Sequence, residues 1–132
     1  GAAGWYNSDY AVGLYATQAG WVQTYNGAGV LANAFQIVSD ARLKDNIVDS
    51  KYGLATVLQL RSVEYDKKHD GKHDVGLIAQ EVERVMPFLV GTDDSGFKSV
   101  AYANIVGLLV EAIKEQNETI KQLNARLEPL EK

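Results

Sequence analysis

The chain has no cysteine, only two histidines, no long apolar run and no excess of basic charge, and each absence narrows its possible functions. Without cysteine, neither disulfide bonds nor thiolate metal sites can hold its 132 residues together. No apolar stretch approaches the roughly 20 residues of a membrane-spanning helix, so we expect no membrane partner. The net charge of −4 leaves no concentrated basic face for phosphate contacts, so we expect no nucleic-acid partner.

Charge is distributed unevenly along the chain. Of thirty charged residues, 13 basic and 17 acidic, only Asp9 lies in residues 1–38. Those 38 residues also contain half of the twelve glycines and seven of the twelve aromatic residues. Two kinds of chain therefore join near Ser39, which predicts a first segment over 1–38 and a globular domain over 39–132.

The first segment has the composition of a β-structure. β-Prone stretches at 11–15, 20–25 and 34–38 alternate with glycine-containing turns. A segment with a single charge, unable to make a core alone, is typical of the end of a fibre in which neighbouring chains complete each strand. The alternative is a flexible Gly/Ala-rich linker, although linkers rarely carry seven aromatic residues.

Residues 39–101 have the pattern of a small globular domain. The polar stretch 39–47 is a turn that could start a short helix or strand. Apolar spacing and turn residues then predict a helix over 53–60, a strand over 62–65, a helix over 77–85 that ends at Pro87, and a hairpin formed by 89–90 and 97–101. With a long C-terminal helix after them, these short elements predict the α+β class.

The last thirty residues carry the clearest periodicity. Apolar residues recur at alternating steps of four and three over four heptads, which favours a left-handed coiled coil and self-association. A single amphipathic helix packed on its own domain is the alternative, but its apolar stripe would be wider than the one over 114–128. Gln116, the polar seam residue, would help fix register and chain number, and Pro129 should end the helix. The predicted seam consists of Tyr102, Val106, Leu109, Ile113, Gln116, Ile120, Leu123, Leu127 and Leu130.

Two motifs within residues 39–132 resemble those of a known family. Residues 39–47, SDARLKDNI, resemble the opening signature of the S74 peptidase family, the intramolecular chaperone domains of phage endosialidases, tailspikes and neck appendages. Residues 75–83, VGLIAQEVE, followed by Met86-Pro87, resemble its second hallmark, and Tyr102 then opens the long helix. Two motifs in this order and spacing make the resemblance specific.

The resemblance implies a homotrimer whose chaperone domain aligns the β-structure upstream in its own chain and then releases itself by autoproteolysis. It assigns a serine–lysine dyad to Ser39 and Lys44 and trimerisation to the helix over 102–130; we expect no cofactor. The protein would be a virion tail or appendage precursor assembled in the host cytoplasm. Two other functions stay open, a trimerisation module that is not cleaved and a conventional hydrolase acting on other proteins. The hydrolase is the weaker, because a single-use site needs no substrate cleft.

The chemistry of Ser39 and Lys44 can also be considered without the family. A serine hydroxyl needs a neighbouring base, and a lysine can serve when burial or nearby cations favour its neutral form. On a helix, Lys44 would lie about 140° around the axis from Ser39. The two therefore meet only if 39–44 forms a turn, or the partner comes from another chain. By themselves they would be a turn serine and a surface lysine.

Ring size indicates where the chain would be cut. Attack of the Ser39 hydroxyl on the carbonyl carbon of Val38 passes through a five-membered ring and gives an ester, whereas attack on its own carbonyl would need a strained four-membered ring. We therefore expect scission of the Val38–Ser39 bond. Cleavage after Ser39 stays open if a serine of another chain attacks. An oxyanion would need backbone N–H donors or a side chain such as Arg42 or Asn46.

His69 and His73 are four residues apart, as a metal-binding pair on a helix would be. Their glycine and charged neighbours favour a solvated turn, so we expect no metal site. Residues 76–80 lack the glycine spacing and Lys-Ser/Thr ending of a phosphate loop, and a strand-to-helix junction fits better. Gln80 and Glu81 could support the site or the trimer contact.

Overall fold

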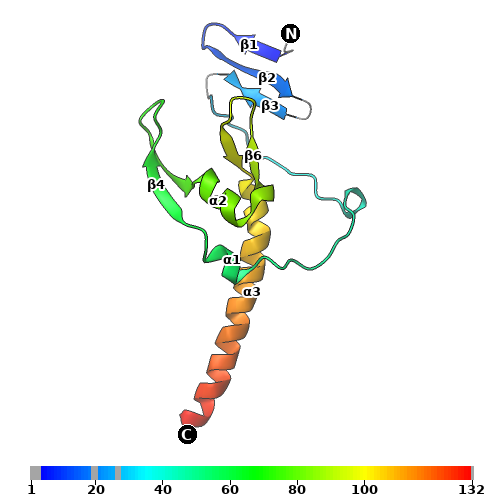
Figure 1. Cartoon of the computed structure of the whole chain (residues 1–132), viewed down its shortest axis with the longest axis vertical. Coiled ribbons are helices and arrows are strands. Elements are labelled where there is room, and N and C mark those ends of the chain that lie inside the picture. The colour runs from blue at the N-terminus through cyan, green and yellow to red at the C-terminus, as the bar shows by residue number, and fades with distance from the viewer. Residues whose placement is uncertain (1–3, 19–20, 26–27, 132) are drawn as a thin grey trace. The chain divides into compact units, whose positions relative to one another are not determined.

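The computed structural model describes residues 4–18, 21–25 and 28–131, and the chain divides into two compact units, Gly1–Asp45 and Asn46–Lys132 (Figure 1). Short antiparallel strands, short helices and one long C-terminal helix make up the described chain. The predicted α+β class is thereby confirmed. Within these residues, no helix combines the length and the apolarity needed to cross a bilayer.

The first unit contains a three-stranded antiparallel sheet in the order β1-β2-β3. Its strands are β1 Gly4–Asn7, β2 Val12–Gln18 and β3 Trp21–Thr24. Strands β2 and β3 overlap the predicted strands at 11–15 and 20–25, although residue 20 lies outside the described residues. Strand β1 was not predicted.

Two glycines allow strands β1 and β2 to lie against each other. A Cβ atom on Gly4 would lie 2.4 Å from the carbonyl oxygen of Leu14, and one on Gly13 would lie 2.4 Å from that of Trp5. These carbonyl oxygens belong to the backbone of the paired strands and cannot move aside as the end of a flexible side chain could. The pairing of these strands therefore depends on glycine at both positions.

Residues 29–51 form a long exposed segment, in which every residue is exposed. The β-prone stretch over 34–38 forms no strand in the single chain, since these residues join none of the sheets in the described chain. A strand needs a neighbour for its N–H and C=O groups, and the single chain supplies none here. A one-turn 3-10 helix, Ala41–Leu43, interrupts the segment.

The second unit combines two β-hairpins with three α-helices (Figure 1). Its elements are α1 Leu54–Val57, β4 Ser62–Asp66, β5 His73–Leu77, α2 Ala79–Val85, β6 Val90–Thr92, β7 Lys98–Val100 and α3 Tyr102–Leu127, with 3-10 turns at Pro87–Leu89 and Glu128–Leu130. The first hairpin pairs β4 with β5, and the second pairs β6 with β7, both antiparallel.

Most of these elements were predicted, with shifted ends. The strand over 62–65 and the hairpin over 89–101 are confirmed. The helix over 53–60 is a single α-helical turn at its N-terminal end. The helix expected from 77 begins at Ala79, because Leu77 still pairs with β4. This change from strand to helix is the junction that the sequence predicted.

The hydrophobic core lies entirely in the second unit. All six buried apolar side chains of the described residues belong to it, and the first unit contributes none. Val82 in the middle of α2 and Met86 just after it are 1% and 0% exposed, and Leu89 packs beside them. Ile105 and Leu108 of α3 close the cluster. Burial of this face of α3 fixes the start of the long helix on the domain.

Helix α3 presents a second apolar face that its own chain leaves uncovered. Ile105, Leu108 and Ala112, which lie beside the predicted seam, are buried, whereas residues 113–131 are all exposed. The α-helix ends at Leu127, two residues before Pro129, as predicted. Seam residues remain exposed along the whole helix: Tyr102, Val106, Leu109, Ile113, Ile120, Leu123, Leu127 and Leu130.

Candidate active site at Ser39 and Lys44

A short turn organises residues 39–44. Asp40 has an extended backbone (φ −65°, ψ 133°), and its carboxylate accepts a hydrogen bond from the backbone N–H of Arg42 at 2.8 Å. The N–H groups of Leu43 and Lys44 then donate to the carbonyls of Asp40 and Ala41, each at 3.1 Å. Asp40 is thus the N-cap of a single 3-10 turn, a role for which aspartate is well suited.

The turn ends abruptly at Lys44. This residue returns to an extended backbone (φ −131°, ψ 135°) instead of continuing the helix. Its side chain is therefore not carried about 140° around a helix axis from Ser39. The Lys44 Nζ donates a hydrogen bond to Ser39 Oγ at 2.6 Å. Of the two routes that the sequence left open, the turn brings both side chains together within one chain.

The Ser39–Lys44 contact has the geometry of a nucleophile and a base. At 2.6 Å the two atoms are within direct proton-transfer distance. A charged ammonium can only donate to the hydroxyl, whereas a neutral amine would accept the hydroxyl proton along the same line. Both residues are exposed to water in the single chain. General-base catalysis therefore needs a cover that removes water from Lys44.

Arg42, a predicted oxyanion donor, is engaged elsewhere. Its Nε donates to Asp40 Oδ1 at 3.0 Å and its Nη2 donates to Oδ2 at 2.7 Å, a two-pronged arrangement. The guanidinium beside Asp40 lowers the pKa of that carboxyl below its ordinary value, and the Arg42 backbone N–H adds to the effect. Two of the five side-chain N–H donors are thereby occupied. The remaining donors leave an oxyanion role for Arg42 as a prediction.

The other predicted site residues lie on either side of the turn. Val38 precedes it in the exposed segment and supplies the carbonyl of the expected scissile bond. Asn46 begins the second unit with a left-handed backbone (φ 54°), a conformation that asparagine tolerates better than most residues. Its predicted part in oxyanion binding stays a prediction. Every residue from Val38 to Asn46 is exposed in the described chain.

The two histidines lie in the β4–β5 hairpin and not on a helix. His73 begins β5, where its Nδ1 lies 3.0 Å from Asp66 Oδ1, and His69 Nε2 lies 3.4 Å from Asp70 Oδ2. Over the described parts of the chain, no group of three or more His, Asp or Glu residues is arranged to hold a metal ion. The side chains are exposed and paired with carboxylates of their own turn.

The second sequence motif is structural in this fold. The hydroxyl of Tyr102 accepts a hydrogen bond from the Leu77 N–H at 2.8 Å. A Cβ on Gly76 would lie 2.6 Å from that hydroxyl oxygen, so glycine leaves the room that Tyr102 needs. Glu81 in the same motif forms an ion pair with Arg61. The motif thus joins the β5–α2 junction to the start of α3.

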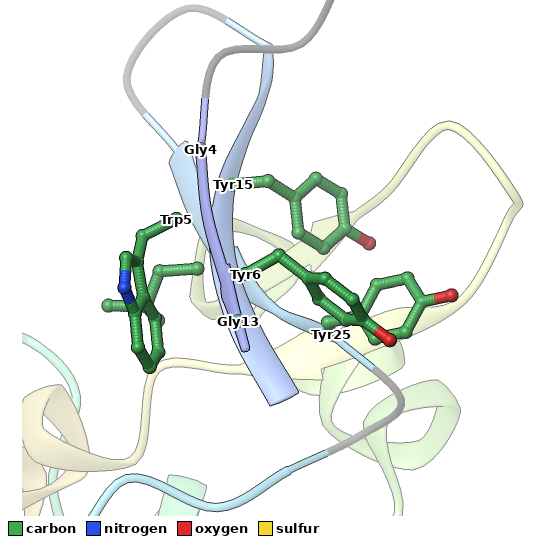
Figure 2. Close-up of a pocket in the computed structure, with 7 residues that line it drawn as sticks. Gly4, Trp5, Tyr6, Gly13, Tyr15 and Tyr25 are labelled. Atoms are coloured by element: carbon green, nitrogen blue, oxygen red, sulfur yellow. The ribbon is translucent and has the colours of Figure 1, made fainter. Parts of the chain in front are cut away.

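An aromatic hollow occupies the sheet of the first unit (Figure 2). It has a volume of about 360 Å³ and is lined by Gly4, Trp5, Tyr6, Gly13, Leu14, Tyr15 and Tyr25. The rings of Tyr6 and Tyr25 meet edge to face at 4.9 Å. Figure 2 shows the three tyrosine rings on one side of the paired strands and Trp5 on the other. Large apolar groups are thus exposed on both faces of a sheet that has no core.

Comparison with known proteins finds one family and several phage relatives that are similar to this chain. Residues 39–91 match the Peptidase S74 family, described as chaperone of endosialidase. The Long tail fiber protein Gp37 of Salmonella phage S16 is 31% identical over 96% of this chain and 19% of its own length. Its counterparts from Enterobacteria phages M1 and Ox2 are 34% and 35% identical, over 72% and 66% of this chain and 42% and 39% of theirs.

The matched stretch, residues 39–91, is similar to the chaperone-of-endosialidase family, the family that the two motifs resemble. It spans about a fifth to two fifths of the length of the tail-fibre relatives that it matches. The family and these relatives support a chaperone role associated with a phage fibre. The match begins at Ser39, the residue at which composition changes and the turn starts.

Proposed function

We propose that this chain is the intramolecular chaperone of a phage tail fibre, which trimerises, folds the fibre end over residues 1–38 and then cuts its own backbone at Val38–Ser39. The observation that carries the proposal is the 2.6 Å hydrogen bond from Lys44 Nζ to Ser39 Oγ. Ser39 and Lys44 meet at the boundary between a charge-poor β-segment and a charged domain, where they would act as nucleophile and base. The protein would act on the virion tail during assembly in the host cytoplasm.

Trimerisation is supported by the two faces of α3. One face is used by the core, through Ile105, Leu108 and Ala112. The other carries the heptad seam and finds no partner among the described residues of its own chain. An apolar seam of this length favours burial between copies, because exposed apolar area is removed from water at about 25 cal/mol per Å².

The first unit supports the chaperone role. Its sheet contributes no buried apolar side chain to the described chain, and residues 29–51 lie exposed throughout. Phe35 and Ile37 are 73% and 69% exposed. A segment of this kind gains its stability from neighbouring chains, so three copies held in register by α3 would supply the missing strand partners.

The reaction would proceed in two balanced steps. Neutral Lys44 takes the hydroxyl proton of Ser39 as Oγ attacks the Val38 carbonyl carbon, and the Val38–Ser39 C–N bond breaks as Lys44 returns the proton to the leaving nitrogen. The product is an ester between the Val38 carbonyl and Ser39 Oγ. Water then hydrolyses the ester to give a Val38 carboxylate, a free Ser39 hydroxyl and a new N-terminal amine.

Trimer formation would switch this chemistry on. In the single chain both dyad residues are exposed to water. Neighbouring chains that cover residues 29–51 would exclude water, favour the neutral amine and hold the scissile carbonyl near Ser39. Cleavage would then report completed assembly, and each chain would react once.

A trimerisation module that stays attached to its fibre is the second candidate. The specific observation in its favour is the exposure of Ser39 and Lys44 together with the names of the relatives, which are fibre proteins. In this case the hydrogen bond between the two residues would only stabilise the turn. The two functions differ solely in whether Ser39 reacts.

The test is the mass of a longer version of the chain that includes its upstream β-region, measured intact and after denaturation. Ser39→Ala and Lys44→Ala are compared with the parent, and Lys51→Ala is the matched control, because it removes a lysine from the same exposed segment. We expect fragments that meet at Val38–Ser39 in the parent and the control, and one uncut chain in the two dyad variants. If the parent is uncut but trimeric by native mass, autoproteolysis is wrong and the function is a trimerisation module that stays attached to its fibre.

A further inference from the structure

We infer that Asp40 is a positioning residue for the Ser39–Lys44 pair: through Arg42 it holds the bend that brings the amine to the hydroxyl. The inference rests on the proposed function for its catalytic meaning, but the bend itself is a geometric claim about the chain. Asp40 contacts neither reacting atom in the structure. It acts on the backbone between them.

The bend depends on a change of backbone conformation at both ends of the turn. Asp40 enters it with an extended backbone, and Lys44 leaves it with an extended backbone, so that only three residues are helical. If the helix were to continue through Lys44, the lysine would point away from Ser39 by about 140°. The contact between Ser39 and Lys44 therefore requires a helical turn that starts at Asp40 and ends after a single turn.

The Asp40 carboxylate supplies three of the hydrogen bonds in this turn. Its Oδ1 accepts from the Arg42 backbone N–H at 2.8 Å and from Arg42 Nε at 3.0 Å, and its Oδ2 accepts from Arg42 Nη2 at 2.7 Å. The Asp40 carboxylate thus binds both the backbone and the side chain of Arg42. This fixes both where the turn starts and the direction of its first peptide.

Burial does not hold this turn. Every residue from 29 to 51 is exposed, so no packing against a core fixes its shape before assembly. Local hydrogen bonds then decide the conformation, since few other contacts compete with them. The lowered pKa of Asp40 keeps the carboxylate ionised from the acid range upward, and the grip on Arg42 is present at neutral pH.

Three variants separate the backbone and side-chain hydrogen bonds between Asp40 and Arg42. Asp40→Asn keeps an oxygen that can accept from the Arg42 N–H but loses the charge, Arg42→Gln loses the two-pronged contact, and Asp40→Ala loses both. From the value of an N-cap we expect Asp40→Ala to slow cleavage about tenfold, and the two milder variants about threefold. Asp45→Ala, the matched control, removes a carboxylate from the same exposed segment and should cut at the parental rate.

Two readouts test the inference on full chains. The first is the cleavage rate of the longer chain, with trimer content followed by native mass. The second uses the uncut Ser39→Ala chain, in which a nuclear Overhauser contact between the new methyl group at position 39 and the Lys44 ε-methylene reports the bend directly. We expect this contact in the Ser39→Ala chain, and its loss when Asp40→Ala is added.

The outcomes distinguish this inference from the proposed function. Slower cleavage by trimeric Asp40→Ala, partial rescue by Asp40→Asn and loss of the Overhauser contact support it. A contact that persists without Asp40, or a parental cleavage rate in Asp40→Ala, overturns it. If the parent is uncut but the Overhauser contact between residues 39 and 44 still depends on Asp40, autoproteolysis is wrong. The control of the bend by Asp40 would then be established without it.

Discussion

Replacing Leu123 by alanine tests the exposed seam of α3 at a position where the single chain and the trimer predict different results. Leu123 is 48% exposed and lies beyond the part of α3 that packs on the core. In a monomer its truncation would change stability by less than about 1 kcal/mol, as surface substitutions usually do. In a coiled coil the same side chain would be buried in three copies at once.

The expected loss in a trimer is large. A buried leucine cut to alanine costs about 2–5 kcal/mol, so three equivalent sites cost at least about 6 kcal/mol per trimer. That corresponds to a fall of about ten-thousandfold in the association constant. Lys121→Ala is the matched control, because Lys121 is exposed on the same turns but lies off the seam, and lysine and alanine are both good helix formers.

Sedimentation equilibrium over a range of concentrations measures the effect, with helical circular dichroism recorded beside it. We expect the parent chain and Lys121→Ala to remain trimeric at concentrations where Leu123→Ala dissociates. The reasoning fails if all three chains have the same mass at every concentration. Equal masses of a monomer would remove the seam as an interface, and equal masses of a trimer would place the interface elsewhere.

Three further predictions concern the second unit. Met86→Ala removes a side chain that is 0% exposed and should lower the free energy of unfolding by about 2–5 kcal/mol in urea titrations, whereas an unchanged midpoint would contradict the assigned core. Tyr102→Phe leaves the Leu77 N–H without its acceptor and should cost about 1 kcal/mol in thermal unfolding; a variant as stable as the parent would show that water replaces the hydroxyl. Arg61 lowers the pKa of Glu81 below its ordinary value of 4.5, so the stability from this pair is present above that pH and is lost as pH falls through the lowered pKa. Glu81→Gln should therefore reduce the fall in melting temperature on acidification, and an identical acid profile would argue against the pair.

Much of the second unit could be predicted from the sequence because its signals are local. The strand before the charged turn at 67–73, the helix that stops before Pro87 and the long heptad helix all follow from spacing within a few turns of chain. The prediction failed where a distant or missing partner decides the structure. Leu77 belongs to β5 and not to the helix because β4 lies beside it, and residues 34–38 stayed unpaired for lack of a neighbour.

The candidate site, too, has features that the sequence predicted and contacts that it did not. The sequence alone determined the residue types, Ser39 before Asp40 and Lys44 five residues on, and their place at the change from a charge-poor to a charged chain. It did not show that Asp40 binds Arg42, although Ser-Asp is a familiar start of a helical turn. The contact between Asp40 and Arg42 depends on the rotamers of both side chains, and residue spacing does not predict rotamers.

By itself the sequence determined the α+β class, the heptad seam and the two family-like motifs, because periodicity and motif spacing are properties of neighbouring residues. Only the three-dimensional structure decided that α3 uses Ile105, Leu108 and Ala112 for its own core and leaves the seam exposed. It alone decided that the chain bends at 39–44 and brings Lys44 Nζ within 2.6 Å of Ser39 Oγ. The physical reason is that burial and side-chain contacts depend on where separate elements meet, whereas a linear pattern records only which residues are available to meet.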